Sequence, residues 1–218
     1  MIIISGNKLL GVITSTRDLL PNEFIPLISS PRAVVALEML QAFWFFLPAY
    51  VANPTAVLFG GGTPMDFGKV LKDGKRLFGD GKTWRGFGGG ILSGIVLGFL
   101  LWGVGALAYA PLSYGQFPEG LVPIILLPLG ALLGDLVGSF IKRRMGKAKG
   151  APVLGLDQYD FMVGAMVLLF IVQTGWFLRH YWDGEAVFGL VFVIVLTPFL
   201  HRAVNIIGFK LGKKEVPW

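Results

Sequence analysis

Five apolar stretches, each long enough to cross a bilayer, dominate this chain of 218 residues. A helix needs about 20 apolar residues to span the hydrocarbon core, so five spans use roughly half of the sequence. Only 15% of the residues are charged, whereas a soluble domain carries roughly 25%. The fold class is therefore all-α, a polytopic membrane protein with about five transmembrane helices. The stretches lie at about Ala33–Ala52, Phe87–Tyr109, Leu121–Ile141, Phe161–Leu178 and Val187–Ile207.

The composition excludes several classes of protein. Disordered chains combine low hydrophobicity with high charge, whereas 54% of these residues are hydrophobic. The chain has no cysteine, so it cannot form a disulfide, a thiolate nucleophile, a cysteine-bound zinc site or an iron–sulfur cluster. The spans and their connections leave no room for a separate soluble catalytic domain. An enzyme of this kind must hold its site in the loops between helices and at the helix ends.

The basic residues are distributed unevenly between the two sides that the spans define. Fifteen of the 19 lysines and arginines fall in the segment 53–85, in the loop after the third span, and in the fifth span and tail. The positive-inside rule places these parts in the cytoplasm and the N-terminus outside a cell membrane that the chain crosses several times. Residues 1–32 never reach span length, so we expect an interfacial or extracytoplasmic extension there and a transmembrane catalytic domain over 33–218.

The first basic loop is rich in glycine. We place it from Asn53 to Gly86, and it contains Gly60-Gly61-Gly62 and Gly79-Asp80-Gly81-Lys82-Thr83. Backbone N–H groups in such a loop can approach an anion, and interleaved lysines add positive charge, a combination suited to a polyphosphate. A basic loop resting on anionic headgroups is the alternative. A P-loop is excluded, because Arg76 stands where its first glycine is required and no strand precedes the segment.

Four polar residues flank the second basic loop. Asp135 and Ser139 are four residues apart and share a helix face, and Asp157 and Asp160 are three apart near the start of the fourth span. An ionisable group inside a span is costly unless it is paired or bound to a metal. Carboxylate ligands beside phosphate partners favour Mg²⁺. The alternative for Asp135 is a buried ion pair with Lys142, Arg143 or Lys82.

Glycines also recur at every fourth position in the second and third spans. Such stripes let helices approach closely. We expect helices two and three to touch through them, which would bring the Thr83–Arg85 segment near Asp135. The stripes are Gly86, Gly90, Gly94 and Gly98 in one span and Gly130, Gly134 and Gly138 in the other.

With both loops in view, the chain resembles the CDP-archaeol synthase family, the archaeal membrane cytidylyltransferases related to bacterial CDP-diacylglycerol synthases. The resemblance covers roughly residues 40–207. Its most specific part runs from Pro48-Ala49-Tyr50-Val51-Ala52-Asn53 through Gly60-Gly61-Gly62-Thr63-Pro64-Met65-Asp66 to Gly79-Asp80-Gly81-Lys82-Thr83-Trp84-Arg85-Gly86. The second block is Ser139-Phe140-Ile141-Lys142-Arg143 with Asp157-Gln158-Tyr159-Asp160. It lacks the His-Gly-Gly segment of the bacterial enzymes, which favours the archaeal branch.

The resemblance implies a reaction and its cofactor. CTP and 2,3-bis-O-geranylgeranylglycerol 1-phosphate would give the CDP-activated lipid and pyrophosphate, with one or two Mg²⁺ ions and no nucleic-acid partner. The alternatives are a CDP-diacylglycerol synthase acting on phosphatidic acid, and a transporter or scaffold without enzymatic activity. A transporter predicts inverted repeats and polar groups at the bilayer midplane, whereas the polar groups of this chain cluster at one face.

The same pattern assigns roles to individual residues. Asp135, Asp157 and Asp160 would hold the metal, while Lys142, Arg143 and Lys82 would hold phosphate oxygens. A phosphomonoester is largely dianionic at neutral pH, so no general base is required, and His180 and His201 receive no role. The predicted CTP-binding residues are Asn53, Gly61, Gly62, Pro64, Asp66, Gly79, Asp80, Gly81, Lys82, Thr83, Gly86 and Ser139.

Overall fold

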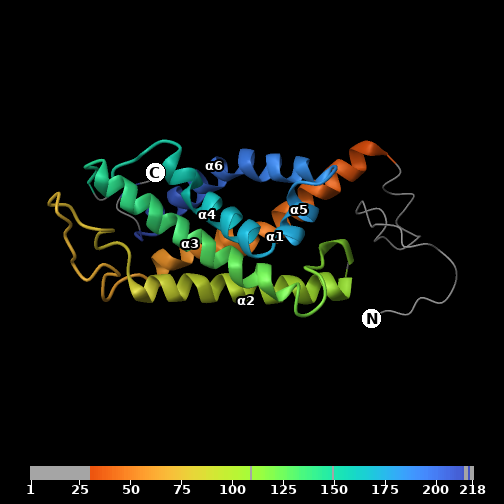
Figure 1. Ribbon diagram of the computed structural model, residues 1–218, viewed down its shortest axis with the longest axis horizontal. Coiled ribbons are helices and arrows are strands. Elements are labelled where there is room, and N and C mark those ends of the chain that lie inside the picture. Colours follow the sequence, from red (N-terminus) through yellow and green to blue (C-terminus); the bar gives the residue numbers. More distant parts are fainter. Residues whose placement is uncertain (1–29, 109, 149, 214–215, 217–218) are drawn as a thin grey trace.

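A computed structural model describes residues 30–108, 110–148, 150–213 and 216, which form a bundle of antiparallel helices (Figure 1). Four helices are long and apolar enough to cross a membrane: α1 (Pro31–Leu58), α2 (Trp84–Ala108), α3 (Leu121–Arg144) and α6 (Ala186–Lys210). The other described elements are the short helices α4 (Leu156–Val172) and α5 (Thr174–Tyr181) and the 3₁₀ turn η2 (Ala110–Leu112). The described segments contain no strand beyond isolated bridges. The chain is thus an all-helical membrane protein, as predicted.

The fourth predicted span is not one continuous helix, which corrects the sequence prediction. It divides at Gln173 into α4 and α5, and the Gln173 side chain donates to the backbone carbonyl of Glu119, 3.0 Å away on the α2–α3 connection. At about 1.5 Å per residue, the 17 residues of α4 are too short to cross a hydrocarbon core of roughly 30 Å. The helix α4 thus ends at the polar pair Gln173-Thr174.

The first helix continues past the predicted end of its span. Asn53, which we expected in the first basic loop, lies inside α1, because the helix tolerates Pro54 and runs on through apolar residues to Leu58. The hydroxyl of Thr55, the residue after Pro54, donates to the carbonyl of Val51 at 2.6 Å.

Two tyrosines compensate for prolines elsewhere in the bundle. A proline inside a helix leaves the carbonyl four residues before it without its usual N–H donor. Pro48 frees the carbonyl of Trp44, which accepts a hydrogen bond from the Tyr114 hydroxyl at 3.3 Å. Pro198 frees the carbonyl of Ile194, which accepts from the Tyr159 hydroxyl of α4, also at 3.3 Å. The second bond ties α4 to α6.

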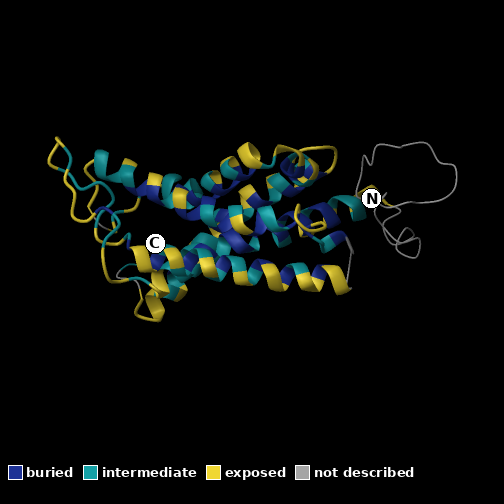
Figure 2. Ribbon diagram, turned by 60° about the horizontal axis from the view of Figure 1, so that its bottom comes forward, coloured by how far each residue is buried: buried dark blue, intermediate teal, exposed yellow. Residues whose placement is uncertain are grey.

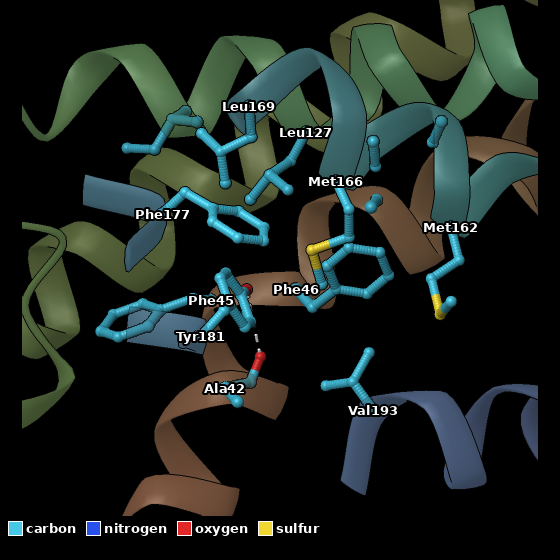
Figure 3. Close-up of a cluster of buried hydrophobic side chains, with 14 of the residues drawn as sticks. Ala42, Phe45, Phe46, Leu127, Met162, Met166, Leu169, Phe177, Tyr181 and Val193 are labelled. Carbon is cyan, nitrogen blue, oxygen red and sulfur yellow. Dashed lines mark hydrogen bonds between the residues drawn. The ribbon is translucent and has the colours of Figure 1, made fainter. Parts of the chain in front are cut away.

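The core lies around the middle of α1. Phe45 and Phe46 are buried there, and Figure 3 shows them among side chains from other helices, including Met166 of α4 and Val193 of α6. The Tyr181 hydroxyl of α5 donates to the carbonyl of Ala42 at 3.4 Å. Exposed residues are spread along the outer sides of the helices (Figure 2), as expected of surfaces that face lipid.

The two glycine stripes have different partners, although the predicted close contact of α2 with α3 is confirmed. A Cβ at Gly94 would lie 2.4 Å from Pro128 of α3 and 2.7 Å from the Pro48 carbonyl of α1, so α2 fits closely against both helices. A Cβ at Gly134 would lie 2.1 Å from the Asp160 carbonyl of α4. The stripe of α3 therefore faces α4.

One end of the bundle gathers the basic segments. The connection 59–83, the connection 145–155 and the C-terminal end of α6 lie together at the left of Figure 1, opposite the start of α1. The predicted grouping of these segments on one side is therefore confirmed, while the side that faces the cytoplasm stays a prediction. Most of the predicted extension 1–32 lies outside the described residues.

Candidate active site

The long basic loop is organised around Asp66. Its buried carboxylate accepts hydrogen bonds from the backbone N–H groups of Gly68 (3.1 Å), Phe78 (3.0 Å) and Gly79 (2.9 Å) and from the Arg76 guanidinium (2.6 Å). Burial acts to raise the pKa of Asp66, but the Arg76 and backbone donors outweigh it and hold this pKa well below its usual value. Asp66 is therefore the ionised anchor of the loop.

A second set of contacts fixes the loop to the end of α3. Arg144 forms an ion pair with Asp73, and its guanidinium also donates to the carbonyl of Lys75 at 3.2 Å. In return the Lys75 ammonium donates to the carbonyl of Arg144 at 2.9 Å. The two basic loops, which are far apart in sequence, thus form one structure.

The segment Gly79–Thr83 is held at the beginning of α2. The N–H of Met65 donates to the Lys82 carbonyl at 2.7 Å, and the Thr83 hydroxyl accepts from the N–H of Gly86 at 3.1 Å. Thr83 is buried and caps the first turn of the helix. The positive end of the α2 dipole therefore points toward this segment, which favours an anion there.

A cavity of about 790 Å³ opens between these loops and the helix ends, within the size range of small-molecule sites. Its walls come from α1, the first basic loop, α3, the connection 145–155, α4, α6 and the C-terminal residues. Twelve of the predicted site residues line it: Gly61, Gly79, Asp80, Gly81, Lys82, Thr83, Asp135, Ser139, Lys142, Arg143, Asp157 and Asp160.

The other predicted residues lie elsewhere. Asn53 and Gly86 line a hollow of about 50 Å³ that adjoins the cavity and shares Lys82 with it. The buried Asn53 side-chain oxygen has no hydrogen-bond partner among the described residues. Gly62, Pro64 and Asp66 line neither space. Contacts of these three with CTP stay a prediction. The Asp66 carboxylate already accepts hydrogen bonds within the loop, so a contact with CTP would compete with those bonds.

Two of the three predicted metal-binding carboxylates are paired with lysines. Lys82 pairs with Asp135, one of the alternatives that the sequence left open. The Lys142 ammonium lies 2.7 Å from Asp157, whose other oxygen accepts the N–H of Val153. In the described part of the chain Asp160 has no ion-pair partner.

The donor set fits a magnesium ion that is shared with a substrate. All three carboxylates line one cavity, but the described residues contain no cluster of three acidic or histidine side chains close enough to cage a metal by themselves. Mg²⁺ is usually held by one or two carboxylates together with substrate phosphates. Gly138 leaves room for the Asp160 carboxylate, because a Cβ at position 138 would lie 2.1 Å from one of its oxygens. The metal assignment stays a prediction.

A comparison with protein families identifies the chain. The family model of the CarS-like CDP-archaeol synthases matches residues 34–218, which include every residue of the cavity. The chain belongs to the CDP-archaeol synthase family.

Individual relatives agree with this membership. A CDP-archaeol synthase of Pyrococcus horikoshii is 44% identical over 181 residues, which cover 83% of this chain and 98% of the relative. One of Methanoculleus marisnigri is 47% identical over 173 residues, covering 79% and 99%. A solved structure of "an intramembrane enzyme for archaeal membrane lipids biosynthesis" is similar with a TM-score of 0.58 and 38% identity, over 77% of this chain and 94% of that one.

The structure adds cavity residues that the sequence did not assign. His201 and Asn205, four residues apart on α6, line the cavity, whereas the sequence assigned no role to His201 and did not name Asn205. Their spacing of four residues near the end of a span was the available signal. The basic residues Lys75, Arg76, Lys147 and Lys213 also line it, although the sequence did not name them as individual site residues.

Proposed function

We propose that the protein transfers the cytidylyl group of CTP to 2,3-bis-O-geranylgeranylglycerol 1-phosphate and releases pyrophosphate, which forms a CDP-activated archaeal lipid. One observation carries this proposal. A single cavity at the end of a membrane bundle brings Lys82, Lys142 and three carboxylates against a glycine-rich loop, in a chain of the CDP-archaeol synthase family. Such a cavity suits a nucleoside triphosphate that meets a phosphate carried by a membrane lipid.

The bonding changes require no base from the protein. A phosphate oxygen of the lipid, already dianionic near neutral pH, attacks the α-phosphorus of CTP and forms a new P–O bond. The bond from the α-phosphorus to the bridging oxygen breaks, and pyrophosphate leaves with its electron pair. What the protein supplies is alignment of the two substrates and positive charge around the phosphates.

The lysines are placed for this charge stabilisation. Lys82 extends from the segment in front of α2, and Lys142 lies in the last turn of α3, so the two line different walls of the cavity. We assign them, with Arg143, to the phosphates of CTP and of the lipid. Their ion pairs with Asp135 and Asp157 keep them inside the cavity before a substrate binds.

The three carboxylates complete the proposed site. Asp135, Asp157 and Asp160 would hold one or two magnesium ions. When bound, Mg²⁺ supplies Lewis-acid stabilisation of the negative charge on the reacting phosphates. The excess of basic residues at this end of the bundle favours a cytoplasmic location, where CTP is available.

The experiment uses the purified protein in lipid nanodiscs. Each of the four ribonucleoside triphosphates is supplied with Mg²⁺ and the ether-lipid phosphate, and both pyrophosphate and the nucleotide-linked lipid are measured. We expect release of pyrophosphate that needs both CTP and lipid and stops when EDTA removes the metal. Phosphatidic acid replaces the ether lipid in a parallel reaction, and its preferred use would support a CDP-diacylglycerol synthase. Hydrolysis without lipid, or no release at all, would contradict the proposal.

A further inference from the structure

The loop that borders the cavity exposes a large aromatic side chain. Phe67 is 73% exposed, and its backbone has a φ of +48°, in the left-handed region that an aromatic residue rarely adopts. The cause is its neighbour Asp66, whose carboxylate is fixed by the loop while its backbone carbonyl accepts the N–H of Lys69 at 2.7 Å. The turn 66–69 therefore holds Phe67 outward.

The outward ring lies next to the lipid-facing side of α2. The centroids of Phe67 and Trp84, the first residue of that helix, are 6.4 Å apart, and Trp84 is itself 50% exposed. Leu92 and Phe99 follow Trp84 on the same side of the helix, since eight and fifteen residues bring a helix back to within about 80°. Both are exposed along a membrane-spanning segment. Phe67 thus extends the apolar side of α2 into the loop.

The length of α2 places this pair at the membrane surface. The helix has 25 residues, whereas about 20 suffice to cross the hydrocarbon core. The remaining turn lies in the headgroup region, and the glycine-rich start of the helix, before its first exposed aliphatic residue Leu92, is the part best suited to lie there. Aromatic side chains at such a boundary anchor a protein in the interface. The exposed Lys69, two residues after Phe67, adds a charge that favours anionic headgroups.

We infer that Phe67 and Trp84 insert into the boundary between headgroups and acyl chains and anchor the first basic loop on the bilayer. The partner of this surface is the lipid bilayer itself. The rigid turn at Asp66 connects the anchor to Gly79, which lines the cavity. The anchor therefore fixes the cavity at the depth where the phosphate groups of membrane lipids lie. The inference needs only the membrane location of the bundle and does not depend on the identity of the substrates.

The absence of cysteine makes a direct test possible. Single cysteines are introduced by Phe67→Cys, by Lys72→Cys at the exposed turn of the same loop, and by Leu92→Cys on the lipid-facing side of α2. Each variant is reconstituted in nanodiscs of mixed neutral and anionic lipid and labelled with an environment-sensitive fluorophore. Quenching is compared between aqueous iodide and lipids that carry a nitroxide near the top of the acyl chain.

Because the label is itself apolar, Lys72→Cys on the same loop is the matched control. We expect label 67 to resemble label 92, with blue-shifted emission and several-fold stronger quenching by the nitroxide lipid than label 72. Quenching of label 67 mainly by iodide, as at position 72, would overturn the inference and leave the ring in water. Protection from both quenchers would overturn it in favour of a protein contact, such as a second copy of the chain.

Discussion

Replacing Asp66 by asparagine tests how the basic loop is built. Whichever carboxylate oxygen becomes an amide NH₂ group, at least two donors lose their acceptor: Gly68 and Arg76 at one oxygen, or Phe78, Gly79 and Arg76 at the other. Each hydrogen bond to a charged group contributes about 1.5–3 kcal/mol, so two cost about 3–6 kcal/mol of loop stability. The protection of loop amides against hydrogen exchange should fall roughly 100-fold or more.

The assay is hydrogen exchange by mass spectrometry on the peptide that covers Phe78 and Gly79, with the protein in nanodiscs. Asp73→Asn is the matched control, because Asp73 lies on the same loop but is exposed, where it pairs with Arg144 and accepts the N–H of Lys75, and exposed ion pairs contribute little to stability. Equal protection in wild type and Asp66→Asn, or an equal loss in both variants, would refute the anchoring role of Asp66.

The same residue predicts a pH dependence. The pKa of Asp66 is lower in the folded loop than in an unfolded chain, so its contribution is complete above the unfolded value of about 4 and is lost as the pH falls toward the folded pKa. Protection factors corrected for intrinsic exchange should therefore decline in wild type below about pH 4. In Asp66→Asn the protection factors should not show this decline below about pH 4.

Two further predictions concern helix packing. Gly138→Ala would place a Cβ 2.1 Å from an Asp160 carboxylate oxygen and 2.8 Å from the Asp160 Cβ, so the carboxylate must turn away and α3 and α4 must move apart. We expect a large loss of cytidylyl transfer, whereas Gly88→Ala, whose Cβ meets nothing within 4 Å, should keep the activity. Equal activities of the Gly138→Ala and Gly88→Ala variants would show that the reaction does not depend on the position of Asp160. Tyr159→Phe removes the donor to the Ile194 carbonyl and should lower the free energy of unfolding by about 1 kcal/mol, measured by thermal denaturation in detergent. An unchanged denaturation midpoint would show that this bond is not stabilising.

Much of the fold was predictable because length and hydropathy suffice to place long membrane helices. The break at Gln173 was not, since it depends on a hydrogen bond to Glu119, a residue 54 positions earlier in the chain. Asn53 was misplaced for a related reason. Proline usually ends a helix in water, whereas helices in apolar surroundings tolerate it, and α1 continues through Pro54 to Leu58.

The candidate site was likewise predictable in part, and the rest depends on contacts between residues far apart in the sequence. The spacing of Asp157 and Asp160 predicted that both would face one cavity if α4 had begun, and they do. Asp66, in contrast, was predicted only as a residue of the CTP pocket, and its role in holding the loop was not foreseen. Its partners Phe78 and Gly79 are 12 and 13 residues away, and only the folded loop reveals them. His201 also lines the cavity; its spacing of four residues from Asn205 was a local signal, but only the folded bundle shows which face of α6 meets the cavity.

The central claim is that the cavity between the basic loops is where CTP reacts, and Asp135→Asn tests it most directly. Asp135 pairs with Lys82 inside that cavity, and asparagine keeps the shape while removing the charge. The measurement is turnover of CTP to the nucleotide-linked lipid by wild type and variant in nanodiscs, with helix content checked by circular dichroism. We expect turnover to fall by orders of magnitude in a protein that remains helical. Near-normal turnover in the folded variant would contradict the assignment of this cavity as the place where CTP reacts.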